Sequence, residues 1–265
     1  MDLSVTVDEG VALLEMRRPP ANHFDEALIG GIVDAALELD ADPACRVILL
    51  ASEGRHFCAG ADFGGGDFAA DHVDAAARLY RRAVRLFDVR TPIVAAVQGT
   101  AVGGGLGLAC AADFRVAEAG TRFVANFARL GFHQGFGLSV TLPELIGRQK
   151  ATDLLLTARR VGGEEAYRIG LADRLAEPGR VRETARALAL EIAASAPLAV
   201  RSMRATLRGD LAGRVRAALE HELAEQKIHW ATPDAAEGIA ASLARRAPNF
   251  TGSVDFTGSP DRPGT

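Results

Sequence analysis

The sequence has few of the residues that mark several common protein classes. Its 265 residues include only three cysteines, Cys45, Cys58 and Cys110, at spacings that match no zinc or redox motif. We therefore expect free buried thiols and no metal site. No run is long and apolar enough to span a bilayer, and the N-terminus lacks the layout of a signal peptide. A cytoplasmic protein without membrane association is the expectation.

An excess of basic residues is also missing. Lys and Arg number 30 against 34 Asp and Glu, a formal net charge of −4, so the composition gives no basic footprint for nucleic acid. A hydrophobic content of 48% in a chain of this length predicts a sizeable core in one large domain with a terminal helical extension.

Two common phosphate-binding motifs are absent as well. A P-loop ends in Gly-Lys-Ser/Thr, and that tripeptide does not occur. Gly105-Leu106-Gly107 begins like a dinucleotide fingerprint but continues as Leu108-Ala109-Cys110, with no acidic residue about twenty residues on in a second βα unit. These absences argue against a nucleotide-dependent oxidoreductase.

The most informative feature that is present is the glycine run Gly103-Gly104-Gly105. It follows a β-branched run and opens an apolar segment compatible with a helix. The first N–H groups of a helix lack partners and favour negative charge, and glycine leaves no side chain over them. The run therefore predicts a site for an anion or a developing oxyanion. An oxyanion hole needs a second donor, and the small residues of Ala59-Gly60-Ala61 are suited to supply one.

Alternating strand and helix patterns predict an α/β fold built from βαβ units. Strand-like runs lie near 3–8, 11–16, 46–51 and 93–97, with short strands near 114–116 and 122–124. Helical patterns lie near 25–39 and 72–89. From about residue 137 the chain is expected to be helix after helix, with breaks at Gly162-Gly163, Pro178-Gly179, Pro197 and Pro233.

Two motifs together resemble the crotonase superfamily, also called the enoyl-CoA hydratase/isomerase family. They are F-C-A-G-A-D at 57–62 and Q-G-x-A-x-G-G-G-x-x-L-A-x-x-x-D at 98–113, and the resemblance runs from about residue 3 to 252. It implies an α/β crotonase (ClpP-like) spiral of ββα units over residues 1–195. It also implies a C-terminal helical trimerisation region over 196–252, a mobile tail over 253–265, and a homotrimer or dimer of trimers.

The resemblance implies acyl-CoA as the substrate, with no permanently bound cofactor, since coenzyme A arrives as part of the thioester. Family members bind the thioester oxygen with two backbone N–H groups, which by motif position are those of Ala59 and Gly104. Loss of one such donor typically costs about 10²–10³ in rate. The implied coenzyme A contacts are Ala61, Asp62, Arg246 and Phe250.

The acids that this resemblance would supply are missing. The two positions where hydratases of the family carry glutamates hold Gly107 and Phe127, and a third acid position used by some other members holds Gly135. Hydration needs a base for water and a proton source for Cα. The chain is therefore interpreted as a divergent member that lacks the two-glutamate hydratase mechanism.

His133 is the nearest titratable candidate, as a catalytic or substrate-orienting residue, because histidine can act as acid or base near neutral pH. A structural histidine that bonds the loop backbone is the alternative. Phe127, Gln134 and Phe136 are expected to line the substrate pocket.

Three functions remain open from the sequence. The first is an enzyme that stabilises a thioester enolate, as a hydratase or isomerase, a thioester hydrolase, or a carbon–carbon bond enzyme. The second is a catalytically silent acyl-CoA binder, and the third is the disfavoured oxidoreductase.

Overall fold

The main sheet of the protein has six strands, in a computed structural model that describes residues 2–61 and 72–253. Their order is β1-β2-β3-β4-β6-β9, with β1 and β2 antiparallel and every other neighbouring pair parallel. The strands are β1 (Leu3–Asp8), β2 (Val11–Met16), β3 (Val47–Ser52), β4 (Ile93–Ala96), β6 (Phe114–Glu118) and β9 (Arg174–Ala176).

A second sheet of three short strands stands beside the first. It contains β5 (Thr100–Val102), β7 (Arg122–Val124) and β8 (Arg160–Gly162), with β5 parallel to β7 and β7 antiparallel to β8. Because β5 leads directly into the glycine run, this small sheet fixes where the following helix begins.

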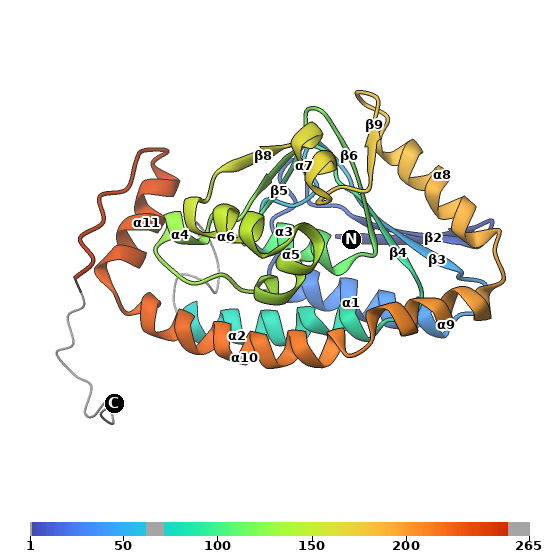
Figure 1. Cartoon of the computed structure of the whole chain (residues 1–265), viewed down its shortest axis with the longest axis horizontal. Helices are drawn as coiled ribbons and strands as arrows, with labels where there is room; N and C mark the ends of the chain where they lie inside the picture. The colour runs from blue at the N-terminus through green and yellow to red at the C-terminus, as the bar shows by residue number, and fades with distance from the viewer. Residues whose placement is uncertain (1, 62–71, 254–265) are drawn as a thin grey trace.

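Helices cover both faces of the main sheet (Figure 1). In β3, alternate residues point to opposite faces. Val47, Leu49 and Ala51 pack in one cluster with helix α8 (Val181–Ala193), whereas Ile48 and Leu50 belong to the larger core that includes α1 (Glu26–Ala41). Burial on both faces explains why this strand is a continuous apolar run.

The remaining helices lie mostly on the α1 side. Helix α10 (Leu211–Trp230) lies alongside α2 (His72–Ala83), and both run along one edge of the molecule in Figure 1. The others are 3₁₀ helix η2 (Val84–Asp88), α3 (Gly104–Ala111), α4 (Phe127–Leu130), α5 (Leu138–Ile146), α6 (Arg148–Thr157), α7 (Gly163–Ile169), α9 (Pro197–Arg208) and α11 (Pro233–Leu243).

Most predicted elements are confirmed within one to three residues, and two expectations need correction. The helical pattern at 72–89 ends as a 3₁₀ helix from Val84, and the C-terminal part is not purely helical because β8 and β9 interrupt it. Strands of three residues are too short to show a periodicity. The expected breaks at Pro197 and Pro233 are confirmed, since each proline stands in the first turn of a helix.

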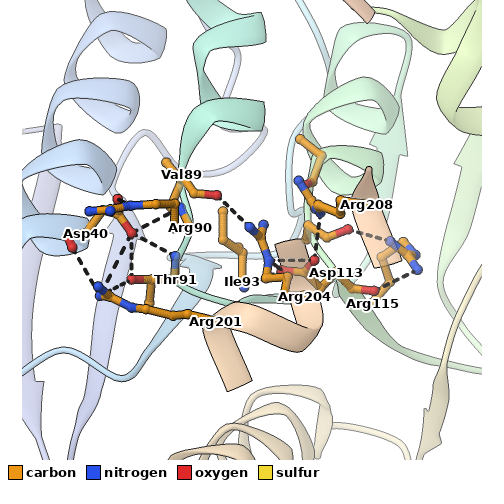
Figure 2. Close-up of polar contacts among 12 residues, drawn as sticks. Asp40, Val89, Arg90, Thr91, Ile93, Asp113, Arg115, Arg201, Arg204 and Arg208 are labelled. Carbon is orange, nitrogen blue, oxygen red and sulfur yellow. Dashed lines mark hydrogen bonds and ion pairs between the residues drawn. The ribbon is translucent and has the colours of Figure 1, made fainter. Parts of the chain in front are cut away.

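Three arginines on one face of α9 attach that helix to the rest of the protein (Figure 2). Arg204 Nε donates to both carboxylate oxygens of Asp113, Arg208 Nε donates to Oδ1 of the same residue, and Arg201 donates to Thr91 Oγ1. Since none of the residues of α9 is buried, these polar contacts are its main attachment.

Candidate active site

The start of helix α3 presents the expected unpaired backbone N–H group. Its N-cap, Gly103, has φ of 55° and ψ of −118°, a conformation that favours glycine, and its own N–H donates to Val124 O at 2.8 Å. The first helical bond is from Gly107 N to Gly103 O. Within the described residues, the N–H of Gly104 therefore has no acceptor and lies at the positive end of the helix dipole.

The segment Ala59-Gly60-Ala61 lies directly against this helix start. A Cβ atom on Gly60 would come within 2.8 Å of Val102 O and 3.8 Å of Gly104 N, so a larger residue would not fit there. Glycine at position 60, with φ of 87°, therefore allows the two motifs to approach each other.

The predicted second donor, Ala59, needs correction. Its N–H donates to Ala21 O at 2.9 Å and is therefore not available to a ligand in this structure. Two residues further on, the N–H of Ala61 has no acceptor in the described part of the chain. The motif position had indicated Ala59, and the hydrogen bond to Ala21, which lies in a turn, is what separates it from Ala61.

A small cavity of about 20 Å³ joins these backbone groups to the side chains around them. Gly60, Ala61 and Gly104 line it together with the side chains of Tyr80 and Phe127. Such a volume is close to that needed by one water molecule. The structure thus brings the predicted residues Ala59, Ala61, Gly104 and Phe127 to one place.

Aromatic rings occupy the space where family acids would project. A Cβ atom on Gly107 would lie 2.5 Å from Phe136 Cβ and 2.6 Å from its Cγ. A Cβ atom on Gly135 would lie 2.7 Å from Tyr80 Cε2 and 2.9 Å from Gln226 Nε2. At the second of the two glutamate positions, the side chain of Phe127 is itself buried against the cavity.

Phe136 and Gln134 do not line this cavity in the described residues. The ring of Phe136 is fully buried between Phe24, at a centroid distance of 6.5 Å, and Tyr80, at 6.0 Å. Gln134 Nε2 donates to Ser139 Oγ at 3.0 Å, within the same loop. Phe136 therefore packs behind Tyr80, which lines the cavity, whereas Gln134 bonds within its own loop.

His133 faces helix α10 and is not among the described residues that line the cavity. Its Nδ1 lies 2.9 Å from Gln134 O and so carries the proton, and its ring is stacked on His229 at 6.4 Å. Burial lowers the pKa of His133, and the neighbouring His229 and His221 act in the same direction. These contacts agree with the structural alternative raised from the sequence.

The predicted coenzyme A residues are spread over different surroundings. Arg246 forms a bidentate ion pair with Glu237, at 2.5 and 2.7 Å, and Phe250 is exposed near the end of the described chain. Asp62 lies outside the described residues, as does the predicted tail from residue 254 onward.

The two polar side chains among the described residues that line the cavity were not predicted from the sequence. Tyr80 lies on α2, within the helical pattern expected near 72–89, and Asn126 precedes Phe127 at the start of α4. The sequence feature that could have indicated Asn126 is its position next to Phe127, which stands where hydratases of the family carry a glutamate. In the described residues, we find no helix long and apolar enough to cross a membrane and no cluster of three metal-binding side chains.

The chain matches the family described as enoyl-CoA hydratase/isomerase over residues 6–253. The chain belongs to the enoyl-CoA hydratase/isomerase family. A crotonyl-CoA hydratase of Syntrophomonas wolfei is 32% identical to it over 92% of this chain and 95% of that protein. A 1,2-epoxyphenylacetyl-CoA isomerase of Escherichia coli is 28% identical over 93% and 97%.

Solved structures of the family share the fold. An enoyl-CoA hydratase from Mycobacterium avium subsp. paratuberculosis has a TM-score of 0.84 at 26% identity, over 95% of this chain and 99% of that one. The crotonase fold predicted from the sequence is thereby confirmed. The relatives named here include a hydratase and an isomerase, so family membership leaves the reaction open.

Proposed function

We propose that this family member binds acyl-CoA thioesters and polarises the thioester carbonyl with the backbone N–H groups of Gly104 and Ala61. The observation that carries the proposal is the unpaired N–H of Gly104 at the start of α3, adjacent to Gly60 and Ala61. Two fixed N–H donors beside a water-sized cavity stabilise charge on an oxygen better than mobile water does.

The proposed chemistry is stabilisation of enolate charge on the thioester oxygen without the paired glutamates that activate water. The Cα proton would pass to water, because the described lining includes no carboxylate or histidine. Gly107 and Gly135 carry no acid, and aromatic rings fill the space beside both. Isomerisation, thioester hydrolysis and carbon–carbon bond chemistry all pass through such a polarised carbonyl. Within this set, the structure favours reactions that do not need two carboxylates.

A catalytically silent acyl-CoA binder is the second candidate, because the described residues that line the cavity include no carboxylate or histidine. Deuterium exchange at Cα of saturated acyl-CoA esters in heavy water separates the two. We expect exchange if the chain is an enzyme. Binding without exchange across a panel of chain lengths would establish the silent binder.

Gly104 can be tested by removing only its N–H group. Proline is tolerated at the first position of a helix, so Gly104→Pro deletes the donor, and Gly104→Ala is the matched control. Both variants add a Cβ atom within 2.3 Å of Phe24 Cζ, and proline also restricts the backbone of Gly103. We expect exchange to be about 10²–10³ slower in the proline variant than in the alanine variant. Equal rates would contradict the assignment of Gly104.

The role of His133 is settled by the same exchange assay. If the histidine moves the proton, His133→Ala abolishes exchange. Because its ring is bonded to the loop backbone and stacked on His229, we expect an unchanged rate together with a lower melting temperature.

A further inference from the structure

Asn126 occupies a helix N-cap without acting as a cap. It precedes α4, where asparagine usually accepts a hydrogen bond from the helix N–H groups, yet its side chain makes no capping bond. The helix start is held by the backbone carbonyl of Asn126 instead, which accepts from Arg129 N at 3.0 Å and Leu130 N at 3.1 Å. The ordinary structural reason for asparagine at this position is therefore missing.

The carboxamide of Asn126 points toward the proposed thioester site. Its Oδ1 lies 2.8 Å from the position that a Cβ atom on Gly103 would take, and the residue lines the same cavity as Gly104. Standard bond lengths then place Oδ1 within about 6 Å of Gly104 N. A group bound to Gly104 and a group bound to Asn126 can thus belong to one short acyl chain.

The side-chain donor and acceptor groups of Asn126 are also unpaired among the described residues. Its side chain is half-buried and has no hydrogen-bond partner among the described residues. The other polar side chain that lines the cavity is Tyr80, whose hydroxyl bonds Gln226. Carboxamides both donate and accept hydrogen bonds, and the described lining includes no cationic side chain. An uncharged oxygen suits this surrounding better than a carboxylate.

We propose that Asn126 is a specificity-determining residue that binds a hydroxyl or oxo oxygen on the acyl chain, close to the thioester. This inference rests on the proposed binding of acyl-CoA. It assigns the preference for a polar acyl group to an asparagine at a helix N-cap whose side chain makes no capping bond. Carbon 3 of the acyl group is the position that suits the distance between Gly104 and Asn126.

The test compares three ligands of equal chain length by calorimetry: butyryl-CoA, 3-hydroxybutyryl-CoA and 3-oxobutyryl-CoA. We expect the wild-type chain to bind both oxygenated esters about tenfold more tightly than butyryl-CoA, the value of one good hydrogen bond. In Asn126→Ala this preference disappears, while the affinity for butyryl-CoA stays within about threefold. Asn249→Ala, at an exposed asparagine near the end of the described chain, keeps the full preference.

Asn126→Asp gives a sharper arm of the test. A carboxylate accepts hydrogen bonds but does not donate them, so this variant keeps the preference for the hydroxyl ester and loses that for the oxo ester. A wild-type chain that binds all three esters equally would overturn the role of Asn126 while leaving the proposed function standing, as would an Asn126→Ala variant that keeps the preference. A chain that binds none of the esters would overturn the proposed function itself.

Discussion

Glycine at position 107 makes room for the ring of Phe136. The ring is fully buried, and its Cγ lies 2.6 Å from where a Cβ atom of residue 107 would be. The small residue and the large one therefore depend on each other. Replacing Gly107 alone with a larger residue therefore disturbs the packing of Phe136, whatever chemical group the new side chain carries.

Restoring the family acid with Gly107→Glu is expected to destabilise the chain and to give no hydration of crotonyl-CoA. Overpacking of this kind costs roughly 1–3 kcal/mol or more, and the glutamate has no route to the cavity past Phe136. The measurement is the free energy of unfolding in urea, together with a hydration assay.

Gly213→Glu is the control for that substitution, because Gly213 is an exposed glycine in α10 with no atom within 4 Å of its Cβ position. There we expect unchanged or slightly raised stability, since glutamate favours a helix more than glycine does. A Gly107→Glu chain with normal stability and hydratase activity would show that Phe136 does not block the site.

The sequence predicted the parts of the site that depend on local backbone conformation. Gly104 follows from motif position, because a helix start is a local feature, whereas Ala61 was expected only as a coenzyme A contact. Ala59 was assigned wrongly because its N–H is taken by Ala21, a contact made between segments far apart along the chain. Asn126 and Tyr80 were missed for the same reason.

At the scale of elements, helix α10 holds the loop that carries Phe136. Glu222 is fully buried, and its two carboxylate oxygens accept from Gly137 N at 2.8 Å and Ser139 N at 2.9 Å. One turn on, Gln226 Nε2 donates to His133 O. Two side chains four residues apart on one helix face therefore fix both ends of the loop.

Glu222→Ala is expected to lower the free energy of unfolding by about 2–4 kcal/mol, because it leaves two backbone N–H groups without acceptors. The matched control is Glu220→Ala, which removes an exposed ion pair with Arg81 and is expected to change stability by less than about 1 kcal/mol. Urea unfolding of both variants measures the difference. Equal losses would show that Glu222 does not hold the loop.

The loss caused by Glu222→Ala should also depend on pH. Burial raises the pKa of Glu222 in the folded state above its ordinary value. The unfolded chain then releases this proton first, so the stabilisation by Glu222 is complete below about pH 4.5 and decreases as the pH rises. We expect a larger difference between wild type and variant at pH 5 than at pH 8.

Helix α9 is attached to the rest of the protein mainly by charged side chains, whereas α10 is also attached by buried apolar side chains. Asp113 accepts from Arg204 and Arg208, whose side chains are 10% and 15% exposed, and also from Ile93 N at 2.8 Å. Asp113→Asn leaves two nearly buried guanidinium groups without a counter-charge and is expected to cost about 3–5 kcal/mol. Detachment of the helix exposes its arginines, so faster tryptic cleavage at Arg201 is the readout.

An exposed ion pair provides the control for the α9 experiment. Asp210→Asn breaks the surface contact with Arg214, and we expect a stability change below about 0.5 kcal/mol and no new cleavage. If Asp113→Asn behaved in the same way, the arginine contacts would not be what holds α9.

At the scale of the whole molecule, α9 turns apolar side chains outward. Met203 and Leu207 are 61% and 86% exposed, and with Val200 they line a cleft of about 490 Å³ beside α8. An apolar stripe of this kind on a helix with no buried residue is typical of an interaction surface. It supports the proposal, first made from the family resemblance, of a homotrimer or dimer of trimers.

Light scattering after size exclusion tests the assembly. We expect a mass of three or six chains for the wild type, and a smaller species for the double variant Met203→Glu with Leu207→Glu. The exposed pair Leu156→Glu and Tyr167→Glu, on α6 and α7, shows whether any loss of apolar surface has this effect. A monomeric wild type would contradict the assembly.

The last residue of α10 is a tryptophan, whose intrinsic fluorescence reports on its surroundings. Trp230, the single tryptophan in the sequence, stacks on Phe132 at a centroid distance of 4.3 Å, and Phe132 lines the cavity beside Gly104. Any ligand that displaces Phe132 must alter the surroundings of that indole. Ligand entry should therefore change the intrinsic fluorescence of the unlabelled protein, and its kinetics can be followed in real time.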